Sequence, residues 1–274
     1  MPPAPMPAFP DRPDLLALDF DGVLCDSVHE ALRSAWQVCR ELGVAEGGDE
    51  PPADLAAAFV RTRPVLEFGW EFPVLVCALL DGMPEEELRR GFQSVWRPRT
   101  LERHGLSREG LMRRFDAVRD RAIAADMDAW LADQALYPGV AERLGAILKD
   151  GIRVFVLTTK EGRFAHRLLA VHGVDFPADQ VWGKEQARPK PELLRRLVAR
   201  YGLAPAGVWF VEDRLATLRA VAREPDLDDV RLFFATWGYT LPAEIAETQA
   251  GGRIVPLTLS QFCGELSGWR GSGA

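Results

Sequence analysis

Short apolar runs alternate with amphipathic segments through the second half of the chain, and this alternation restricts the fold more than any other feature. The apolar runs predict strands, and the segments between them have the apolar spacing of helices. Strands that alternate with helices form βαβ units and pack as a parallel sheet. The predicted strands are 15–18, 153–157, 180–182, 207–211, 231–235 and 253–255, and the predicted helices are 140–149, 162–172, 191–201, one from Leu215, and 242–249.

The block between the first strand and residue 136 has no strand pattern. A helix is predicted at 28–42, a turn-rich linker follows it, and helical spacing then continues almost without interruption. We therefore expect a separate helical layer, inserted after the first strand, with hinges near 25–27 and 135–138. The further candidate helices are 54–60, 65–80, 84–95 and 107–132.

Two predicted strands end in pairs of acidic residues. Asp19 and Asp21 follow the first strand, and Glu212 and Asp213 follow a later one. Carboxylates are rarely buried unless they are paired or bound to a metal, and open α/β sheets bind ligands beyond the carboxyl ends of their strands. Because Mg²⁺ takes oxygen ligands, Asp19, a backbone oxygen near Asp21, and Asp213 are candidate ligands of a magnesium site. A capped loop and a salt-bridged turn are the alternative interpretations.

Hydroxyl and ammonium groups also stand close to predicted strand ends. Thr158 and Thr159 precede a predicted helix, where hydroxyl and backbone N–H groups can hold a phosphate. Lys190 precedes another predicted helix and is a candidate to neutralise phosphoryl oxygens, although Arg188 and Lys184 compete for that role. A helix cap for the threonines and a solvated lysine are the alternatives that stay open.

Composition excludes several classes of partner. The formal net charge of −7 argues against nonspecific binding to nucleic acid or to an anionic membrane surface. No apolar run approaches the length of a membrane span. The four cysteines include no CxxC pair, so neither a zinc site nor a disulfide framework is indicated. We expect reduced thiols in a cytoplasmic protein.

The order of these motifs resembles that of the haloacid dehalogenase superfamily of hydrolases. The resemblance runs from Leu15 to Thr236, and the position of the helical block between the first and second motifs is similar to the phosphoglycolate phosphatase and β-phosphoglucomutase branch. In this sequence the four motifs look like Asp19-Phe20-Asp21-Gly22-Val23, Thr158, Lys190 and Glu212-Asp213.

The resemblance implies an α/β fold with a three-layer, Rossmann-like parallel-sheet core and an inserted all-helical cap domain. The expected organisation is a disordered, proline-rich tail at 1–13, a catalytic core at 14–27 and 136–265, a cap at 28–135, and a flexible tail at 266–274.

The resemblance also implies a Mg²⁺-dependent phosphatase that acts on a small phosphorylated substrate, as a monomer or homodimer. Asp19 would attack phosphorus and form an aspartyl-phosphate, and Asp21 would serve as general acid and then general base. Thr158 and Lys190 would hold the phosphoryl oxygens. The expected metal ligands are Asp19, Asp21, Glu212 and Asp213, and the expected substrate contacts are Thr159, Arg61 and Arg63.

Some features leave alternatives open. The family often has a second acidic residue about four positions after the first one of its last motif, where this chain has Thr217, so we expect the metal site to depend more on Glu212. Arg61 and Arg63 of the cap have a solvated face as their alternative. A phosphomutase and a non-catalytic binding protein are competing functions, whereas the carboxylate at Asp21 argues against a dehalogenase.

Overall fold

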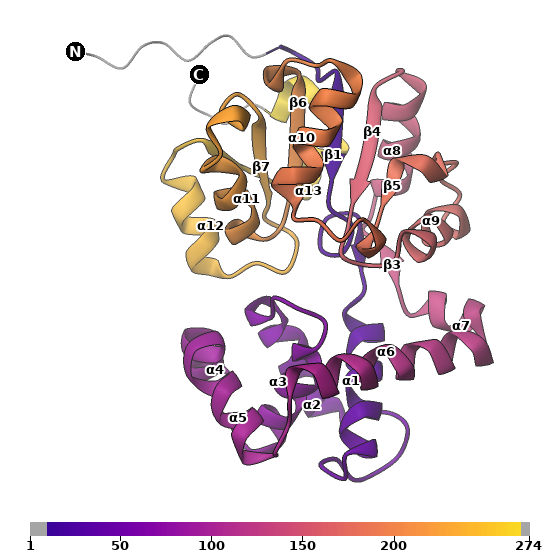
Figure 1. Ribbon diagram of the computed structural model, residues 1–274, viewed down its shortest axis with the longest axis vertical. Helices are drawn as coiled ribbons and strands as arrows, with labels where there is room; N and C mark the ends of the chain where they lie inside the picture. The colour runs from indigo at the N-terminus through magenta and orange to yellow at the C-terminus, as the bar shows by residue number, and fades with distance from the viewer. Residues whose placement is uncertain (1–9, 270–274) are drawn as a thin grey trace. The chain divides into compact units, whose positions relative to one another are not determined.

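The computed structural model of the protein describes residues 10–269, which form two compact units (Figure 1). One unit combines residues 10–26 with residues 136–269, and the other is 27–135. Most of the predicted disordered tail at 1–13 lies outside the described residues. Within its described part, the Arg12 side chain donates a hydrogen bond to the carbonyl of Asp150 at 3.0 Å.

The first unit contains one six-stranded sheet with the order β5-β4-β1-β6-β7-β8, in which every neighbouring pair is parallel. The predicted α/β class with a parallel sheet is therefore confirmed. The strands are β1 Leu15–Leu18, β4 Arg153–Leu157, β5 Val181–Trp182, β6 Val208–Glu212, β7 Arg231–Ala235 and β8 Ile254–Leu257.

Strand β1 lies in the middle of this sheet, between β4 and β6, with Leu18 opposite Val156 on one side and Val211 on the other. The chain builds outward from β1 to β4 and β5, and then returns to the other side of β1 to add β6. This change of direction is a topological switch point, the place where open α/β sheets bind ligands.

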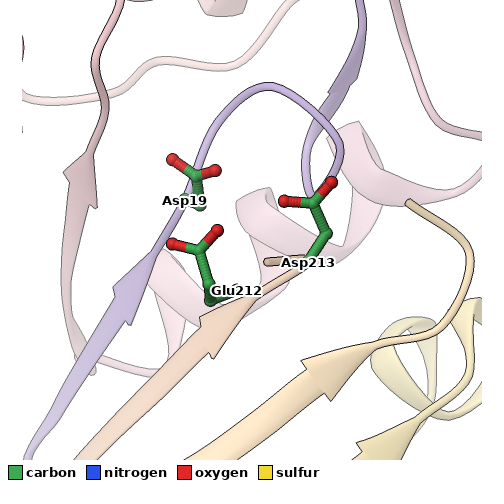
Figure 2. A group of neighbouring side chains, drawn as sticks. All are labelled: Asp19, Glu212 and Asp213. Atoms are coloured by element: carbon green, nitrogen blue, oxygen red, sulfur yellow. The ribbon is translucent and has the colours of Figure 1, made fainter. Parts of the chain in front are cut away.

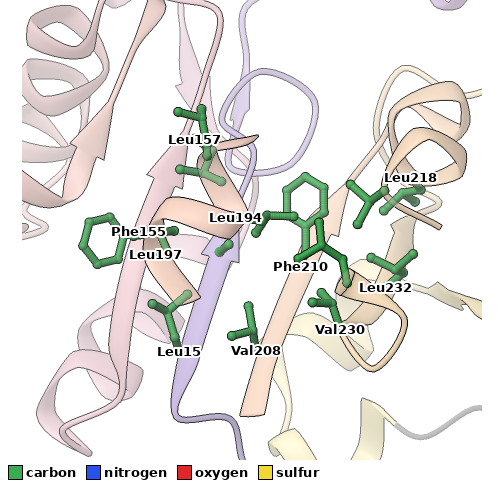
Figure 3. Packing of buried hydrophobic residues seen from close by; sticks show 14 of the residues in the cluster. Leu15, Phe155, Leu157, Leu194, Leu197, Val208, Phe210, Leu218, Val230 and Leu232 are labelled. Carbon is green, nitrogen blue, oxygen red and sulfur yellow. The ribbon is translucent and has the colours of Figure 1, made fainter. Parts of the chain in front are cut away.

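Apolar side chains from alternate positions of the strands meet two helices on one face of the sheet (Figure 3). Phe155 and Phe210 from the strands pack with Leu194 of helix α10 and Leu218 of α11 in a single buried cluster. Full burial of one leucine or phenylalanine contributes about 1.5–3 kcal/mol relative to exposure, so this layer fixes the strand ends firmly. The helices of this unit are α8 Val140–Lys149, α9 Gly162–Val171, α10 Lys190–Tyr201, α11 Leu215–Ala222, α12 Pro242–Gln249 and α13 Leu259–Cys263.

An aromatic cluster includes the intervening positions of β6 and β7. Trp209 and Phe233 from these strands contact Trp269, whose ring also stacks on Phe262 of α13. Trp269 is fully buried, so the expected flexible tail at 266–274 is ordered at 266–269, where the chain makes a 3₁₀ turn. Residues 266–269 are held by packing against the distant sheet, and such packing leaves no local strand or helix pattern in the sequence. The turn was therefore not predicted.

Residues 27–135 contribute no strand to the six-stranded sheet of the described chain, and they form helices that surround a core of their own. Phe59, Phe72 and Phe115 make successive ring contacts within this unit. Its helices are α1 Val28–Glu41, α2 Ala53–Thr62, α3 Glu71–Leu80, α4 Glu85–Gly91, α5 Arg97–Arg103, α6 Arg108–Ala125 and α7 Met127–Ala132.

Several helix boundaries in this unit differ from the prediction. The helix expected at 65–80 begins at Glu71. Before it, Arg63–Val65 form a separate 3₁₀ turn. The helix expected at 84–95 passes through a π-helical turn, Phe92–Trp96, into the unpredicted α5. The helix expected at 107–132 divides at Asp126, whose extended backbone ends α6 and whose carboxylate caps α7.

The two passages of chain that join the units pair with each other as a two-stranded sheet, β2 Cys25–Asp26 and β3 Ala135–Leu136. These passages coincide with the expected hinges, and movement about them stays a prediction. Among the described residues, no helix has the length and apolarity that crossing a membrane requires.

Candidate active site

Strand β1 delivers Asp19 to the middle of the sheet edge. The four apolar residues of β1 are completely buried, and the Asp19 backbone N–H continues the sheet by donating to the Val211 carbonyl at 2.9 Å. Strand β6 delivers its last residue, Glu212, to the same edge, with Asp213 directly after it. Parallel neighbours end at one edge, so these three carboxylates meet although about 190 residues separate them in the chain.

Asp19, Glu212 and Asp213 form an acidic cluster in which one ligand atom from each residue lies within 4.8 Å of the others (Figure 2). The three residues are 7%, 1% and 1% exposed. Buried carboxylates at this separation repel one another unless cations compensate them. A hard divalent cation with a preference for oxygen fits this donor set.

Lys190 lies against this acidic cluster. Its Nζ atom is 2.5 Å from Asp19 Oδ1 and 2.6 Å from Glu212 Oε2, and its side chain is 12% exposed. Of the three cations considered for this position, Lys190 is the one that the structure places here. Arg188 instead pairs with Glu192 in an exposed ion pair, and Lys184 pairs with Glu161.

The acidic cluster alters the titration of its members. Burial, and then repulsion by Glu212, raises the pKa of Asp19 to about 7, although the Lys190 ammonium opposes this rise. Burial lowers the pKa of Lys190, but attraction by Asp19 and Glu212 outweighs burial and leaves the pKa of Lys190 above its ordinary value. The site therefore holds a charged lysine beside a carboxylate whose ionisation is costly.

Asp21 has a different environment from Asp19. Among the described residues its carboxylate is not a member of the acidic cluster, and a contact of Asp21 with a metal through a backbone oxygen stays a prediction. Its Oδ1 atom instead lies 2.9 Å from Nζ of Lys160, whose side chain is 6% exposed while that of Asp21 is 22% exposed. The sequence interpretation missed Lys160. Its position two residues after Thr158, beyond the end of β4, was the available signal.

The two threonines after β4 also differ from each other. Thr158 is buried, its backbone N–H donates to the Trp182 carbonyl at 2.9 Å, and its hydroxyl accepts from the Lys160 N–H at 3.0 Å. Thr158 therefore stabilises the turn that positions Lys160. Thr159, at the same strand end, is exposed to solvent.

A loop after β7, residues 236–240, also contributes to this edge of the sheet, and no motif in the sequence predicted it. The Tyr239 N–H donates to Asp213 Oδ2 at 2.8 Å, and its phenol donates to Asp26 Oδ1 at 2.9 Å. A Cβ atom on Gly238 would lie 2.2 Å from the Gly22 carbonyl oxygen, so only glycine allows this approach. The loop orients Asp213 through backbone contacts that no motif records.

We expect Gly22→Ala to destabilise the protein by about 2 kcal/mol or more, through backbone strain and a steric clash. Gly22 has φ +91°, and an added Cβ would meet Asp213 Oδ2 at 1.9 Å. The matched control is Gly173→Ala, with φ +77° and no atom near the added Cβ, which should cost about 1 kcal/mol. Urea unfolding measures the loss of stability in both variants. Equal losses would show that the cost at Gly22 comes only from its positive φ and not from a clash with Asp213.

The two cap arginines expected to bind substrate have partners within the helical unit. Arg61 makes a two-pronged contact with the Glu85 carboxylate, at 2.6–3.2 Å, and Arg63 lies over the Phe72 ring at 4.8 Å from its centroid. A contact of either residue with substrate stays a prediction.

Comparisons with known proteins identify a family for this chain. A family model described as haloacid dehalogenase-like hydrolase matches residues 13–223. A phosphoglycolate phosphatase of Nitrosococcus oceani is 24% identical over 244 residues, which cover 87% of this chain and 90% of that protein. A phosphoglycolate phosphatase of Pseudomonas putida is 27% identical over 234 residues, covering 83% and 71%.

Solved structures share the fold. A structure from Haemophilus somnus, described as a predicted phosphoglycolate phosphatase, has a TM-score of 0.58 at 18% identity and covers 90% of this chain and 94% of its own. A structure from Clostridium acetobutylicum, described as a predicted phosphatase, has a TM-score of 0.57 at 14% identity, with 92% and 97% covered. The predicted resemblance, the fold and the hydrolase class of the phosphatase type are confirmed.

Proposed function

We propose that this chain, which belongs to the haloacid dehalogenase-like hydrolase family, is a Mg²⁺-dependent phosphatase that hydrolyses a small phosphorylated metabolite. The observation that carries the proposal is the cluster of Asp19, Glu212 and Asp213 at the switch point of the sheet, with Lys190 against it. The cluster supplies a nucleophile and oxygen ligands, and Lys190 supplies positive charge for an anionic substrate.

In this proposal Asp19 is the nucleophile. It attacks phosphorus, the bond to the leaving oxygen breaks, and an aspartyl-phosphate forms. Asp21 gives a proton to the leaving oxygen, and then takes one from the water that attacks the intermediate. Lys190 and Thr158 hold phosphoryl oxygens, and Thr159, Arg61 and Arg63 stay proposed substrate contacts.

Mg²⁺ would be held by carboxylate oxygens of Asp19, Glu212 and Asp213, and when bound it would supply positive charge that offsets the repulsion between Asp19 and an anionic substrate. Two features support this assignment: the three carboxylates are buried, and one oxygen from each lies within 4.8 Å of the others. Glu212 contributes an oxygen to the acidic cluster, which agrees with its expected larger role in the absence of an acidic residue at Thr217.

The names of the two curated relatives make 2-phosphoglycolate the first substrate to test. Phosphorus NMR of the products distinguishes hydrolysis from transfer within the substrate. The proposal predicts inorganic phosphate as the product from at least one small phosphate monoester. Conversion of a sugar phosphate to its positional isomer, without net phosphate release, would instead identify a phosphomutase.

Binding of Mg²⁺ is expected to weaken as the pH falls below about 7, the raised pKa of Asp19. The folded metal-free protein keeps a proton on Asp19 at a pH where an unfolded chain has lost it, and bound Mg²⁺ must displace that proton. The apparent Kd should therefore rise by up to about tenfold per pH unit below this pKa and level off above it. Titration calorimetry between pH 5.5 and 8 measures the profile.

Asp19→Asn is the control for this profile, since an amide does not titrate in this range. The variant should bind Mg²⁺ more weakly and with a flatter pH dependence. A wild-type Kd that stays constant from pH 5.5 to 8 would show that Asp19 is ionised throughout.

A further inference from the structure

The ion pair between Lys160 and Asp21 is the feature of this site that the family motifs leave unexplained. Asp21 lies two residues after the nucleophile, in a site that already gathers three carboxylates. Among the described residues the Asp21 carboxylate is not one of the three in the acidic cluster, although a bound divalent cation would attract a fourth carboxylate. A carboxylate bound to a metal gives up the basicity that proton transfer requires. Proton transfer by Asp21 is therefore favoured by a group that keeps its carboxylate from binding the metal.

Lys160 is fixed in place before any ligand arrives. Its backbone N–H donates to the Thr158 hydroxyl at 3.0 Å, and its carbonyl accepts from the Lys184 N–H at 2.9 Å. Gly183 packs so closely that a Cβ there would lie 2.6 Å from the Lys160 carbonyl oxygen. The backbone of Lys160 is thus held from both sides, so little freedom is left for the residue to lose.

The side chain of Lys160 is equally well defined. It is 6% exposed, and its ammonium lies 5.4 Å from the centroid of the Phe20 ring and 2.9 Å from Asp21 Oδ1. Burying an ammonium is costly unless a carboxylate compensates it, so the ammonium and the Asp21 carboxylate hold each other strongly. The Asp21 side chain stays 22% exposed, which leaves it accessible to water.

We propose that Lys160 is a positioning residue that holds the Asp21 carboxylate away from the metal ligands and keeps it available for proton transfer. This inference rests on the proposed phosphatase function, and it assigns a role to a residue that touches Asp21 rather than the reacting phosphorus. Lys160 and Lys190 then have separate tasks, since Lys190 contacts Asp19 and Glu212.

The first test is kinetic, with saturating Mg²⁺ and the best substrate. Lys160→Met should lower kcat by about 10²-fold, the usual contribution of a general acid–base group, and leave KM within about threefold of wild type. Lys160→Arg keeps the charge and should recover most of kcat. The matched control is Lys184→Met, an exposed lysine paired with Glu161, which should behave as wild type. An increase of KM at unchanged kcat would overturn the proposal, because Lys160 would then bind substrate.

The second test measures Mg²⁺ binding alone, by titration calorimetry, in wild type, Lys160→Met, Asp21→Asn and the double variant. Removing a positive charge tightens Mg²⁺ binding in any background. If Lys160 also restrains Asp21, the gain from Lys160→Met should be about tenfold larger when Asp21 is present than in the Asp21→Asn background. Equal gains in the two backgrounds would mean that charge alone acts, and would overturn the proposal.

These results separate the two proposals. Wild-type protein that binds Mg²⁺ and hydrolyses a phosphate monoester, with Lys160→Met unchanged in both respects, contradicts only the role of Lys160. Wild-type protein that does neither contradicts the phosphatase function, and the role of Lys160 with it.

Discussion

Replacing Asp19 by Asn is expected to lower phosphate release by at least about 10⁴-fold, because an amide cannot serve as the nucleophile. The side chains have nearly the same shape, and Asp19 is the residue that β1 places at the middle of the sheet edge. The fold should survive, since the substitution removes one of three mutually repelling carboxylates. Steady-state assays on a panel of phosphate monoesters measure the loss, and urea unfolding checks the fold.

The control for this prediction is Asp175→Asn, the same chemical change at an exposed position. It should keep wild-type turnover. If Asp19→Asn retains turnover within about tenfold of wild type, Asp19 is not the nucleophile and another group must carry the phosphoryl transfer.

Replacing Lys190 by Met is expected to destabilise the metal-free protein by about 3–5 kcal/mol, the cost of removing one partner from a buried ion pair. The ammonium lies within 2.6 Å of both Asp19 and Glu212, and both carboxylates are buried, so loss of the lysine removes the cation that compensates them. Turnover should also fall by about 10²–10³-fold, because the phosphoryl oxygens lose a fixed cation. Urea unfolding in the presence of a chelator measures the first effect.

Arg188→Met tests the competing assignment of this role. Arg188 is exposed and paired with Glu192, and exposed pairs contribute about 1 kcal/mol at most. Its loss should change both stability and turnover little. An Arg188→Met variant that loses as much turnover as Lys190→Met would show that the phosphoryl group is held by both cations.

The sheet and the main part of the acidic cluster could be predicted because each depends on local sequence. Continuous apolar runs identify strands buried on both faces, and β1, β4 and β7 have the predicted boundaries. Parallel strands end at one edge, so Asp19 and Asp213 could be expected to meet from their positions alone.

The remaining parts of the site depend on contacts between distant segments. In the sequence, Lys160 is an ordinary lysine that follows a strand. Only the fold brings its ammonium to Asp21. In the sequence, Tyr239 is one residue of a loop. Only the fold places its backbone N–H at Asp213. Neither contact leaves a periodic or spaced pattern in the sequence. The helix boundaries near Glu71 and Asp126 were missed for a related reason, since local turns there override a continuous helical spacing.

Phosphate release by the wild-type protein, from a panel of small phosphate monoesters that includes 2-phosphoglycolate, tests the proposed phosphatase function directly. The assay is run with Mg²⁺, after chelation, and after Mg²⁺ is restored. We expect release from at least one monoester, loss of that release on chelation, and its recovery with Mg²⁺. Release that chelation leaves unchanged, or no release from any monoester, would contradict the proposed function.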